Sequence, residues 1–278
     1  MKKEASFTLI ELLVVITAIG LIATITLVSV GSAREKARIG KALEFNQQIE
    51  HILGAYALGL WRFEEAGNIV MDSSGYANDG IVFGTTRVEG IIGFGRRFDG
   101  IDDYIAIQNL YFDRAGAISE LTVCAWFKTT FSGGGFSENW AFLDFDRDSY
   151  FSFYIRGGDG KLGFSTRETG GGIDDFQGNR VLNDGKWHFG CAVYDGRDKI
   201  LYVDGFEDNK ELNAHGGANL GRNVTRYGFI GDGSEASTFN GVRKNRYYEG
   251  EMDEVFFYEQ ALTSAQIRSY YLVRLNDF

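Results

Sequence analysis

One apolar stretch near the N-terminus constrains the fold of this chain more than any other feature. The 24 residues from Phe7 to Val30 are apolar, or small and polar, apart from one glutamate, Glu11. A helix rises about 1.5 Å per residue, so this stretch would be about 36 Å long, enough to cross the roughly 30 Å hydrocarbon core of a bilayer. We therefore expect a transmembrane helix over about residues 7–30.

Glu11 is the residue of this stretch that needs a partner. An ionised carboxylate inside the membrane costs about 2.5–3.5 kcal/mol on insertion scales, so a group that later neutralises it is expected. Lys2 and Lys3 precede the stretch and favour a cytoplasmic N-terminus before assembly. The core of an ordinary secretory signal is only about 7–15 residues long, so this segment is not typical of one.

A basic leader followed by Ser6-Phe7-Thr8-Leu9-Ile10-Glu11-Leu12-Leu13-Val14 resembles the N-terminus of type IV pilins and pseudopilins. The resemblance implies that residues 1–6 are a leader, and that a prepilin peptidase cuts between Ser6 and Phe7 and methylates the new amine. Most family members have glycine before the cut, and Ser6 departs from that pattern. The resemblance also implies that Glu11 pairs with the amine of Phe7 on a neighbouring subunit. The alternative is a single-pass anchor whose acid lies near the interface.

Helical periodicity continues past the membrane stretch. Apolar residues recur three and four positions apart, at Ile39, Ala42, Leu43, Ile49, Ile52, Leu53 and Tyr56. This spacing predicts an amphipathic continuation, so we expect one long helix over residues 7–58. The chain contains no proline, and a bend is expected only at Gly20 or Gly31.

The composition changes after Leu58, since 33 of the 37 glycines follow that point. Short alternating runs such as 121–127 are separated by Asp-Gly pairs, which suit tight turns that need positive φ. The pattern predicts an all-β sandwich over residues 59–278. Thr263 and Gln266 have the spacing of a capping box and precede apolar residues at helical spacing, which predicts a short C-terminal helix. The expected fold class is α+β.

Several landmarks of the predicted sandwich resemble the laminin-G-like, concanavalin A-like jelly roll. They are Leu60 to Glu65, Asp72 to Gly80, Arg97 to Tyr104, Leu121 to Phe127, Asp184 to His188, Leu201 to Gly205 and Met252 to Leu262. The resemblance covers nearly all of the second domain. It implies a domain that binds ligands such as glycans or matrix proteins.

A structural calcium ion is a further expectation. Calcium takes six to eight oxygens from carboxylates, amides and carbonyls in turns. In related jelly rolls such an ion ties an N-terminal loop to the last strand, which here implies Asp72, Asn78 and Asp253 as ligands. Asp102 and Asp103 are further candidates. The alternative is that these residues satisfy their own backbone in Asx turns and hairpins.

Cys124 and Cys191 are the only cysteines, and an even count in an exported chain is compatible with a disulfide. The resemblance places both on strands of the sandwich. A bridge is expected if these strands are neighbours. Two buried free thiols are the alternative.

Catalysis is not expected. Glu251-x-Asp253 begins like the E-x-D-x-x-E strand of bacterial β-glucanases, which resemble this domain, but Phe256 stands where the second glutamate would be. A retaining glycosidase needs two carboxyl groups about 5–5.5 Å apart. The three histidines, at positions 51, 188 and 215, show no metal-ligand spacing.

Residues 59–278 hold 22 Lys and Arg against 33 Asp and Glu, so the predicted head domain is acidic. An acidic surface repels phosphates, and no nucleic-acid partner is expected. The expected partners are other pilin subunits, prepilin peptidase, and surface glycans or matrix protein. The chain would reside in the cytoplasmic membrane as a single-pass protein before assembly, and then in an extracellular filament or at the cell surface.

Three functions remain open. The first is a subunit of a type IV filament, as a major or minor pilin or a pseudopilin, which displays the laminin-G-like head for adhesion. The second is a glycan-binding adhesin at a filament tip. The third, least favoured, is a membrane-anchored enzyme that acts on glycosides.

Overall fold

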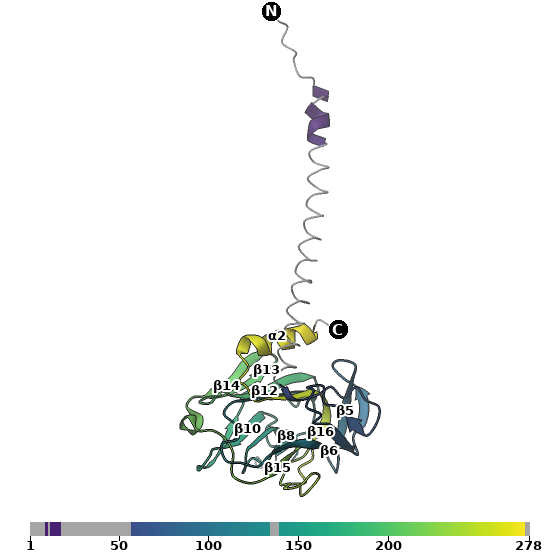
Figure 1. Ribbon diagram of the computed structural model, residues 1–278. Helices are drawn as coiled ribbons and strands as arrows, with labels where there is room; N and C mark the ends of the chain where they lie inside the picture. Colours follow the sequence, from purple (N-terminus) through teal and green to yellow (C-terminus); the bar gives the residue numbers. More distant parts are fainter. Residues whose placement is uncertain (1–8, 11, 18–56, 134–138, 276–278) are drawn as a thin grey trace, which may run out of the picture. The chain divides into compact units, whose positions relative to one another are not determined.

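The computed structural model describes residues 9–10, 12–17, 57–133 and 139–275 of the 278-residue chain (Figure 1). The chain divides into two compact units, Met1–Gln48 and Ile49–Phe278.

In the first unit, residues 9–10 and 12–17 are helical, as predicted for this segment. The hydroxyl of Thr17 donates to the backbone carbonyls of Leu13 and Val14, as expected for a threonine in a helix. The rest of the helix predicted over residues 7–58 lies outside the described residues, except at its C-terminal end. Within the described parts of the chain, no helix is long and apolar enough to cross a membrane.

The second unit is a sandwich of two antiparallel eight-stranded sheets, which confirms the predicted jelly roll. In spatial order, the first sheet contains β14 (Phe206–Glu211), β13 (Lys199–Val203), β12 (His188–Tyr194), β7 (Leu121–Lys128), β16 (Glu249–Tyr258), β5 (Phe94–Asp99) and β4 (Thr86–Glu89), with β1 (Ala57–Trp61) also paired to β16. The second sheet contains β11 (Ile173–Gln177), β10 (Leu162–Arg167), β9 (Phe151–Arg156), β8 (Asn139–Asp144), β15 (Arg226–Ile230), β6 (Tyr104–Phe112), β3 (Gly80–Phe83) and β2 (Ile69–Val70). A short 3₁₀ helix, η1 (Ala214–Gly217), precedes β15.

The predicted boundary between helix and sandwich needs a small correction. Strand β1 begins at Ala57, inside the range 7–58 that was predicted as helix. Ala57 pairs with Tyr258 at the end of β16, and both residues are buried. Pairing with the last strand therefore determines where the sandwich begins.

Alternation along the strands builds the main core between the sheets. On β7, Val123, Ala125 and Phe127 point into this core, while Cys124 and Trp126 point to the opposite, outer face of the first sheet. Successive side chains of a strand point to opposite faces, so one strand supplies both surfaces. All five side chains are nevertheless buried, which means that something covers the outer face.

That cover is the predicted C-terminal helix, α2 (Ser264–Leu275), drawn yellow in Figure 1. Its N-terminus has the expected capping box, since the backbone N–H of Thr263 donates to the Gln266 side chain at 2.8 Å and the N–H of Gln266 donates to the Thr263 hydroxyl at 3.3 Å. Ile267 and Tyr270 of α2 pack on Phe189, Phe256 and neighbouring residues of the outer face. The helix thereby buries a second apolar cluster outside the sandwich.

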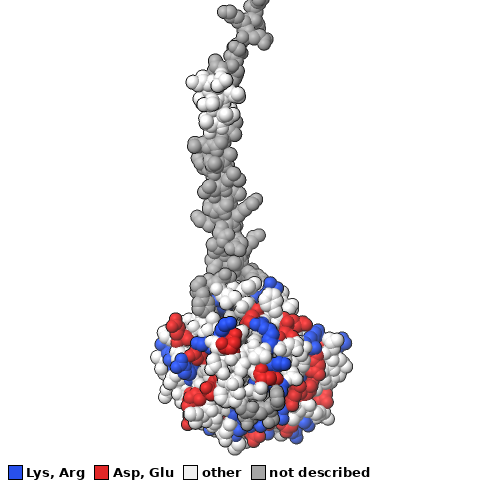
Figure 2. Space-filling model, turned by 180° about the vertical axis from the view of Figure 1, so that it is seen from behind, with Lys and Arg blue, Asp and Glu red and all other residues white. Residues whose placement is uncertain are grey.

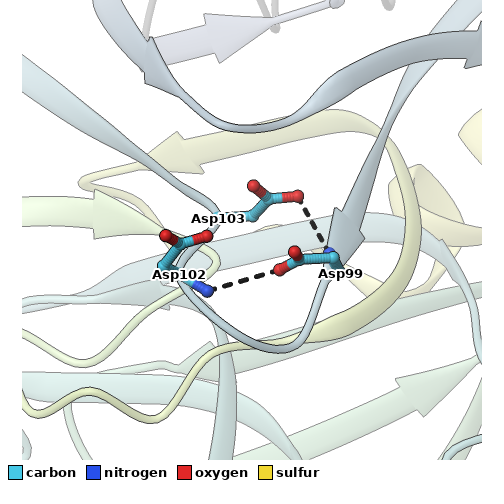
Figure 3. Close-up of side chains that lie close together, drawn as sticks. All are labelled: Asp99, Asp102 and Asp103. Carbon is cyan, nitrogen blue, oxygen red and sulfur yellow. Dashed lines mark hydrogen bonds between the residues drawn. The ribbon is translucent and has the colours of Figure 1, made fainter.

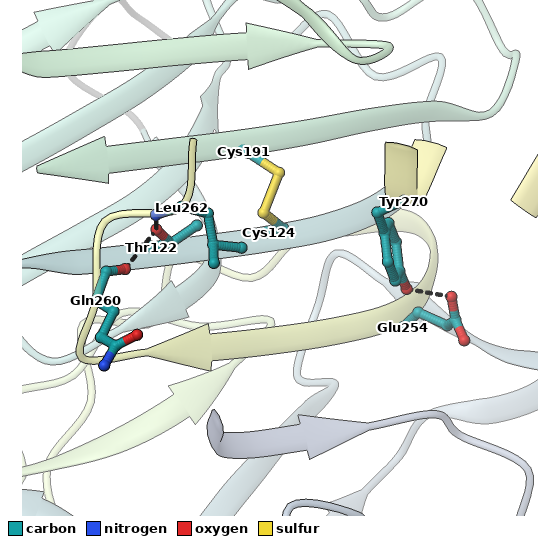
Figure 4. The surroundings of a disulfide bond; sticks show 7 residues. All are labelled: Thr122, Cys124, Cys191, Glu254, Gln260, Leu262 and Tyr270. Atoms are coloured by element: carbon teal, nitrogen blue, oxygen red, sulfur yellow. Dashed lines mark hydrogen bonds between the residues drawn. A yellow bond between two sulfur atoms is a disulfide. The ribbon is translucent and has the colours of Figure 1, made fainter. Parts of the chain in front are cut away.

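The two cysteines lie beneath α2. Cys124 on β7 is directly opposite Cys191 on β12, and the two form a disulfide (Figure 4). Beside it, the carboxylate of Glu254 accepts a hydrogen bond from the Tyr270 hydroxyl and lies 3.0 Å from the Arg274 guanidinium. The disulfide and this buried polar contact both lie where α2 packs on the sheet.

Candidate functional site

A row of three charged side chains crosses the uncovered part of the outer face of the first sheet. Arg97 on β5, Glu251 on β16 and Lys128 on β7 are direct cross-strand neighbours. Glu251 accepts a hydrogen bond from Arg97 at 2.6 Å through Oε1 and one from Lys128 at 3.0 Å through Oε2. The register of the three strands places these side chains next to one another. Opposite charges at directly paired positions stabilise the strand pairs.

The carboxylate at the centre of the row is held in its ionised form. Burial alone would raise the pKa of Glu251. The hydrogen bonds from Arg97 and Lys128 nevertheless hold this pKa below its ordinary value. The side chain of Glu251 is 11% exposed, whereas those of Arg97 and Lys128 are 59% and 39% exposed. Both cations therefore keep donor groups available to a ligand.

Two adjoining hollows share this row, and we call them together the charged groove. One has a volume of about 320 Å³ and is bounded by Asp99, Thr129, Thr130, Gly185, Glu249 and Gly250 in addition to the row. The other has a volume of about 340 Å³ and is bounded by Val88, Glu89, Gly90 and Trp187 in addition to the row. Trp187 is half-buried, and the Lys128 ammonium lies 6.0 Å from the centre of its ring.

The groove combines an aromatic ring with hydrogen-bonding groups of both signs. An aromatic face offers a flat apolar surface, and a few converging polar groups fix the orientation of a ligand. The groove holds two cations and the carboxylates of Glu89, Asp99, Glu249 and Glu251, so it suits a polar ligand that both donates and accepts hydrogen bonds. Charges of both signs are also interspersed over the face of the head that is visible in Figure 2.

Asp253 lies two residues along β16 from Glu251 but has a different environment. Its carboxylate is fully buried and accepts hydrogen bonds from the backbone N–H groups of Ile91, Ile92 and Glu254 at 2.8–3.1 Å. Burial, with a further contribution from Glu254, raises the pKa of Asp253 to about 8. Asp253 thus anchors the loop between β4 and β5 onto the sheet. Because it is fully buried, its carboxyl group is not accessible to a ligand beside that of Glu251.

The other two predicted calcium ligands lie in the loop after β2. Asp72 accepts hydrogen bonds from the N–H groups of Leu60, Ser74 and Asn78 and from the Ser74 hydroxyl, at 2.6–3.0 Å. The side-chain amide of Asn78 donates to the carbonyl of Leu58. Backbone N–H groups and the Ser74 hydroxyl occupy the Asp72 oxygens, and backbone N–H groups occupy those of Asp253, so a calcium ion would fit only after the loop rearranges. Calcium binding by these residues stays a prediction.

Asp102 and Asp103, the further candidates, lie beside Asp99 (Figure 3). Asp99 accepts from the N–H groups of Ile101 and Asp102, and Asp103 accepts from the N–H of Asp99. Burial raises the pKa of Asp103. These contacts form the tight turn between β5 and β6, and they account for the closeness of the three carboxylates.

The processing and assembly residues Ser6, Phe7 and Glu11 lie outside the described residues. Sequence reasoning also missed Arg97, Lys128 and Trp187 as groove residues. Arg97 and Trp187 lie within jelly-roll landmarks, and Lys128 directly follows one. Their convergence in space, however, depends on strand register. The separation of Glu251 from Trp187 along the chain hides their proximity.

Comparison with known families identifies both parts of the chain. The family described as the concanavalin A-like lectin/glucanases superfamily matches residues 99–268, which is more than half of the chain. The prokaryotic N-terminal methylation motif matches residues 1–27. A search of curated proteins finds no match.

Similar solved structures include two binding domains of toxins. The binding domain of Paraclostridial Mosquitocidal Protein 1 matches with a TM-score of 0.61 and 13% identity, over 79% of this chain and 52% of that one. The binding domain of botulinum neurotoxin serotype D matches with a TM-score of 0.60 and 11% identity, over 81% of this chain and 52% of that one. This chain therefore spans about half the length of these toxin domains.

A third similar structure is domain 4 of AbnA, an extracellular GH43 arabinanase from Geobacillus stearothermophilus, in complex with arabinotriose. It matches with a TM-score of 0.55 and 17% identity, over 77% of this chain and 97% of that domain. At these identities the three likenesses establish the jelly-roll fold.

Proposed function

Because the chain belongs to the concanavalin A-like lectin/glucanases superfamily, we propose that it is a type IV pilin-like filament subunit whose head binds glycans at the cell surface. The observation that carries this proposal is the presence of a methylation motif and a lectin-like sandwich in one chain. The motif supplies the route to a filament, and the sandwich supplies a binding surface.

Assembly depends on the pairing of Glu11 with a neighbouring amine. In the proposal, prepilin peptidase cuts after Ser6, and the methylated amine of Phe7 pairs with Glu11 of an adjacent subunit. The subunit resides in the inner membrane until then. The Glu11→Ala variant is expected to remain in the membrane and to be lost from surface fibres, because its neighbour's amine has no counter-ion. Leu12→Ala is the matched control and should assemble. Normal fibre yield from Glu11→Ala would contradict the proposal.

The charged groove is the proposed glycan site of the head. Trp187 would stack on a sugar ring, and Arg97, Lys128 and Glu251 would bond hydroxyl groups. The arabinanase domain, which was solved in complex with arabinotriose, has the same fold and supports the proposal at the level of fold. Glycan-array binding by the wild-type chain should be lost in Trp187→Ala and kept in Phe206→Ala, an exposed aromatic outside the groove.

We also propose that the head binds without hydrolysing its ligand. Two observations support this proposal: Glu251 is paired with two cations, and Asp253 is buried and accepts three backbone hydrogen bonds. A tip-located adhesin is the second candidate function, and the groove would serve it equally well. The abundance of the chain in sheared fibres separates the two, because a tip protein is a trace component.

A further inference from the structure

A fully buried lysine lies at the sandwich edge formed by β11, β13 and β14. Lys199 begins β13 and is paired with Tyr194 on β12 and Glu211 on β14. Its side chain is 0% exposed and reaches the second sheet at Asp174 on β11. Lysine is almost never fully buried unless it is paired, so this ammonium group is expected to have partners of opposite charge.

Two carboxyl groups and two aromatic rings surround the Lys199 Nζ. Nζ donates to the backbone carbonyl of Asp174 at 2.9 Å and lies 3.2 Å from Asp174 Oδ2. Glu211 Oε2 is 3.9 Å away, and this oxygen atom is itself buried and has no hydrogen-bond partner among the residues that the structure describes. The rings of Phe164 and Phe176 have their centres 5.5 and 5.6 Å from Nζ. The amine thus lies within hydrogen-bond distance of one carboxyl oxygen, in a buried pocket that two aromatic rings and two carboxyl groups line.

The pocket shifts the pKa values of Lys199 and Glu211 towards their uncharged forms. Burial lowers the pKa of Lys199, although Asp174, Glu211 and Asp175 oppose the shift. Burial also raises the pKa of Glu211, and its contact with the Asp174 carboxyl raises it further against the effect of Lys199. His215, on η1, faces the same pocket, and burial and Lys199 lower its pKa. A neutral amine is a nucleophile, and a protonated carboxyl group beside it can transfer protons.

We propose that Lys199 and Asp174 become joined by an amide bond, with Glu211 as the residue that transfers protons. Lys199 first passes one proton to the Asp174 carboxylate. The neutral Nζ then attacks Cγ of Asp174, and the new Nζ–Cγ bond forms. The protonated Glu211 gives its proton to the departing Asp174 hydroxyl, the Cγ–O bond breaks, and a proton from Nζ returns to Glu211. One water molecule leaves, and nothing is oxidised or reduced.

The partial exposure of the two carboxyl groups suits this reaction. The side chains of Asp174 and Glu211 are 26% and 36% exposed, so the released water has a path to solvent while the amine remains dry. The product would connect β11 of the second sheet to β13 of the first. It would thus cross-link the two sheets, whereas the disulfide between Cys124 and Cys191 joins two strands of the same sheet.

Mass spectrometry of the full-length chain, purified from membranes, tests the proposal directly. The expected intact mass is lower by one water molecule than that of the processed, disulfide-bonded sequence. Trypsin should fail to cut after Lys199, and peptide 168–180 should remain linked to peptide 198–210. Fragmentation should place the link at Asp174 rather than Asp175. A wild-type chain with no loss of water, cut normally after Lys199, would show an ion pair only and overturn the proposal.

Variants separate the role of each group. Lys199→Met and Asp174→Ala remove a reacting atom, and both should show the full mass. Glu211→Gln keeps the shape of the side chain but not its acid, and most of this variant should lack the link. Glu207→Gln, on the exposed part of the same strand, is the matched control and should be linked like the wild type. Complete linkage in Glu211→Gln would contradict the role given to Glu211.

Discussion

The outer face of the first sheet has two halves that come from the same strands but differ in what lies above them. Cys124, Trp126 and Phe256 occupy the half beneath α2 and are fully buried or nearly so. Lys128 on β7 and Glu251 on β16 occupy the other half, where hollows take the place of a helix. We call these the covered half and the open half.

This difference shows that the presence or absence of α2 above the sheet, and not the strands themselves, determines whether the outer face is buried or accessible. In both halves the side chains alternate between the core and the outer face. Beneath α2, the outward positions carry aromatic residues and a disulfide, which contribute to stability. Without a cover, the outward positions carry an ion-paired row that solvent and ligands can reach. This row depends on the register of β5, β16 and β7.

The largest expected effect is in the covered half. Phe256→Ala removes a ring that contacts Phe189 and Tyr270, with centres 6.0 and 4.9 Å apart, and leaves a cavity under α2. The free energy of unfolding should fall by about 3–5 kcal/mol, as for other large core truncations. Chemical denaturation of the purified chain measures this. A loss below about 1 kcal/mol would mean that α2 contributes little to the stability of the sandwich.

In the open half, the expected effect on stability is smaller and the effect on binding is larger. Glu251→Gln breaks contacts to two cations that are more than one-third exposed, and such exposed pairs contribute only about 0.2–1 kcal/mol. The variant should unfold almost as the wild type does but lose measurable glycan binding. Lys210→Gln, which breaks an ion pair outside the groove, is the control and should bind normally. Strong destabilisation by Glu251→Gln would contradict this prediction, because it would mean that the open half contributes to stability as the covered half does.

The two acids of β16 should give opposite pH dependences. Burial raises the pKa of Asp253 to about 8, so its contribution to stability is complete below its unfolded pKa and declines as the pH rises towards 8. The pKa of Glu251 is lowered, so its contribution is present above its unfolded pKa and is lost as the pH falls through the folded value. Unfolding free energies measured from about pH 4 to pH 8 should therefore slope less steeply downward in Asp253→Asn than in the wild type. Equal slopes in the variant and the wild type would contradict the raised pKa of Asp253.

The smallest expected effect concerns the loop around Asp72. Its oxygens already accept hydrogen bonds from Leu60, Ser74 and Asn78, so a chelator should leave the melting temperature nearly unchanged. Thermal denaturation with and without EDTA checks this, and added calcium provides the converse test. A clear drop with EDTA, restored by calcium, would confirm the calcium ion expected from the sequence and would mean that the loop rearranges to bind it.

The sequence predicted the sandwich and its C-terminal helix because both have local signals. Asp-Gly turns separate alternating runs, and the capping box at Thr263 marks the start of α2. The site was not predictable in the same way. Arg97, Lys128 and Glu251 come from three distant segments, and their convergence depends on cross-strand register, for which a single sequence carries no local signal. The pairing of Cys124 with Cys191 stayed open in the sequence for the same reason.

The N-terminal residue of the protein in surface fibres decides whether the chain is processed and assembled as a pilin. Fibres are sheared from cells that produce the full chain, and the protein within them is sequenced from its N-terminus by mass spectrometry. The proposal predicts a chain that begins at methylated Phe7, with residues 1–6 removed. A chain in the fibres that still begins at Met1, or the absence of the chain from the fibres, would contradict it.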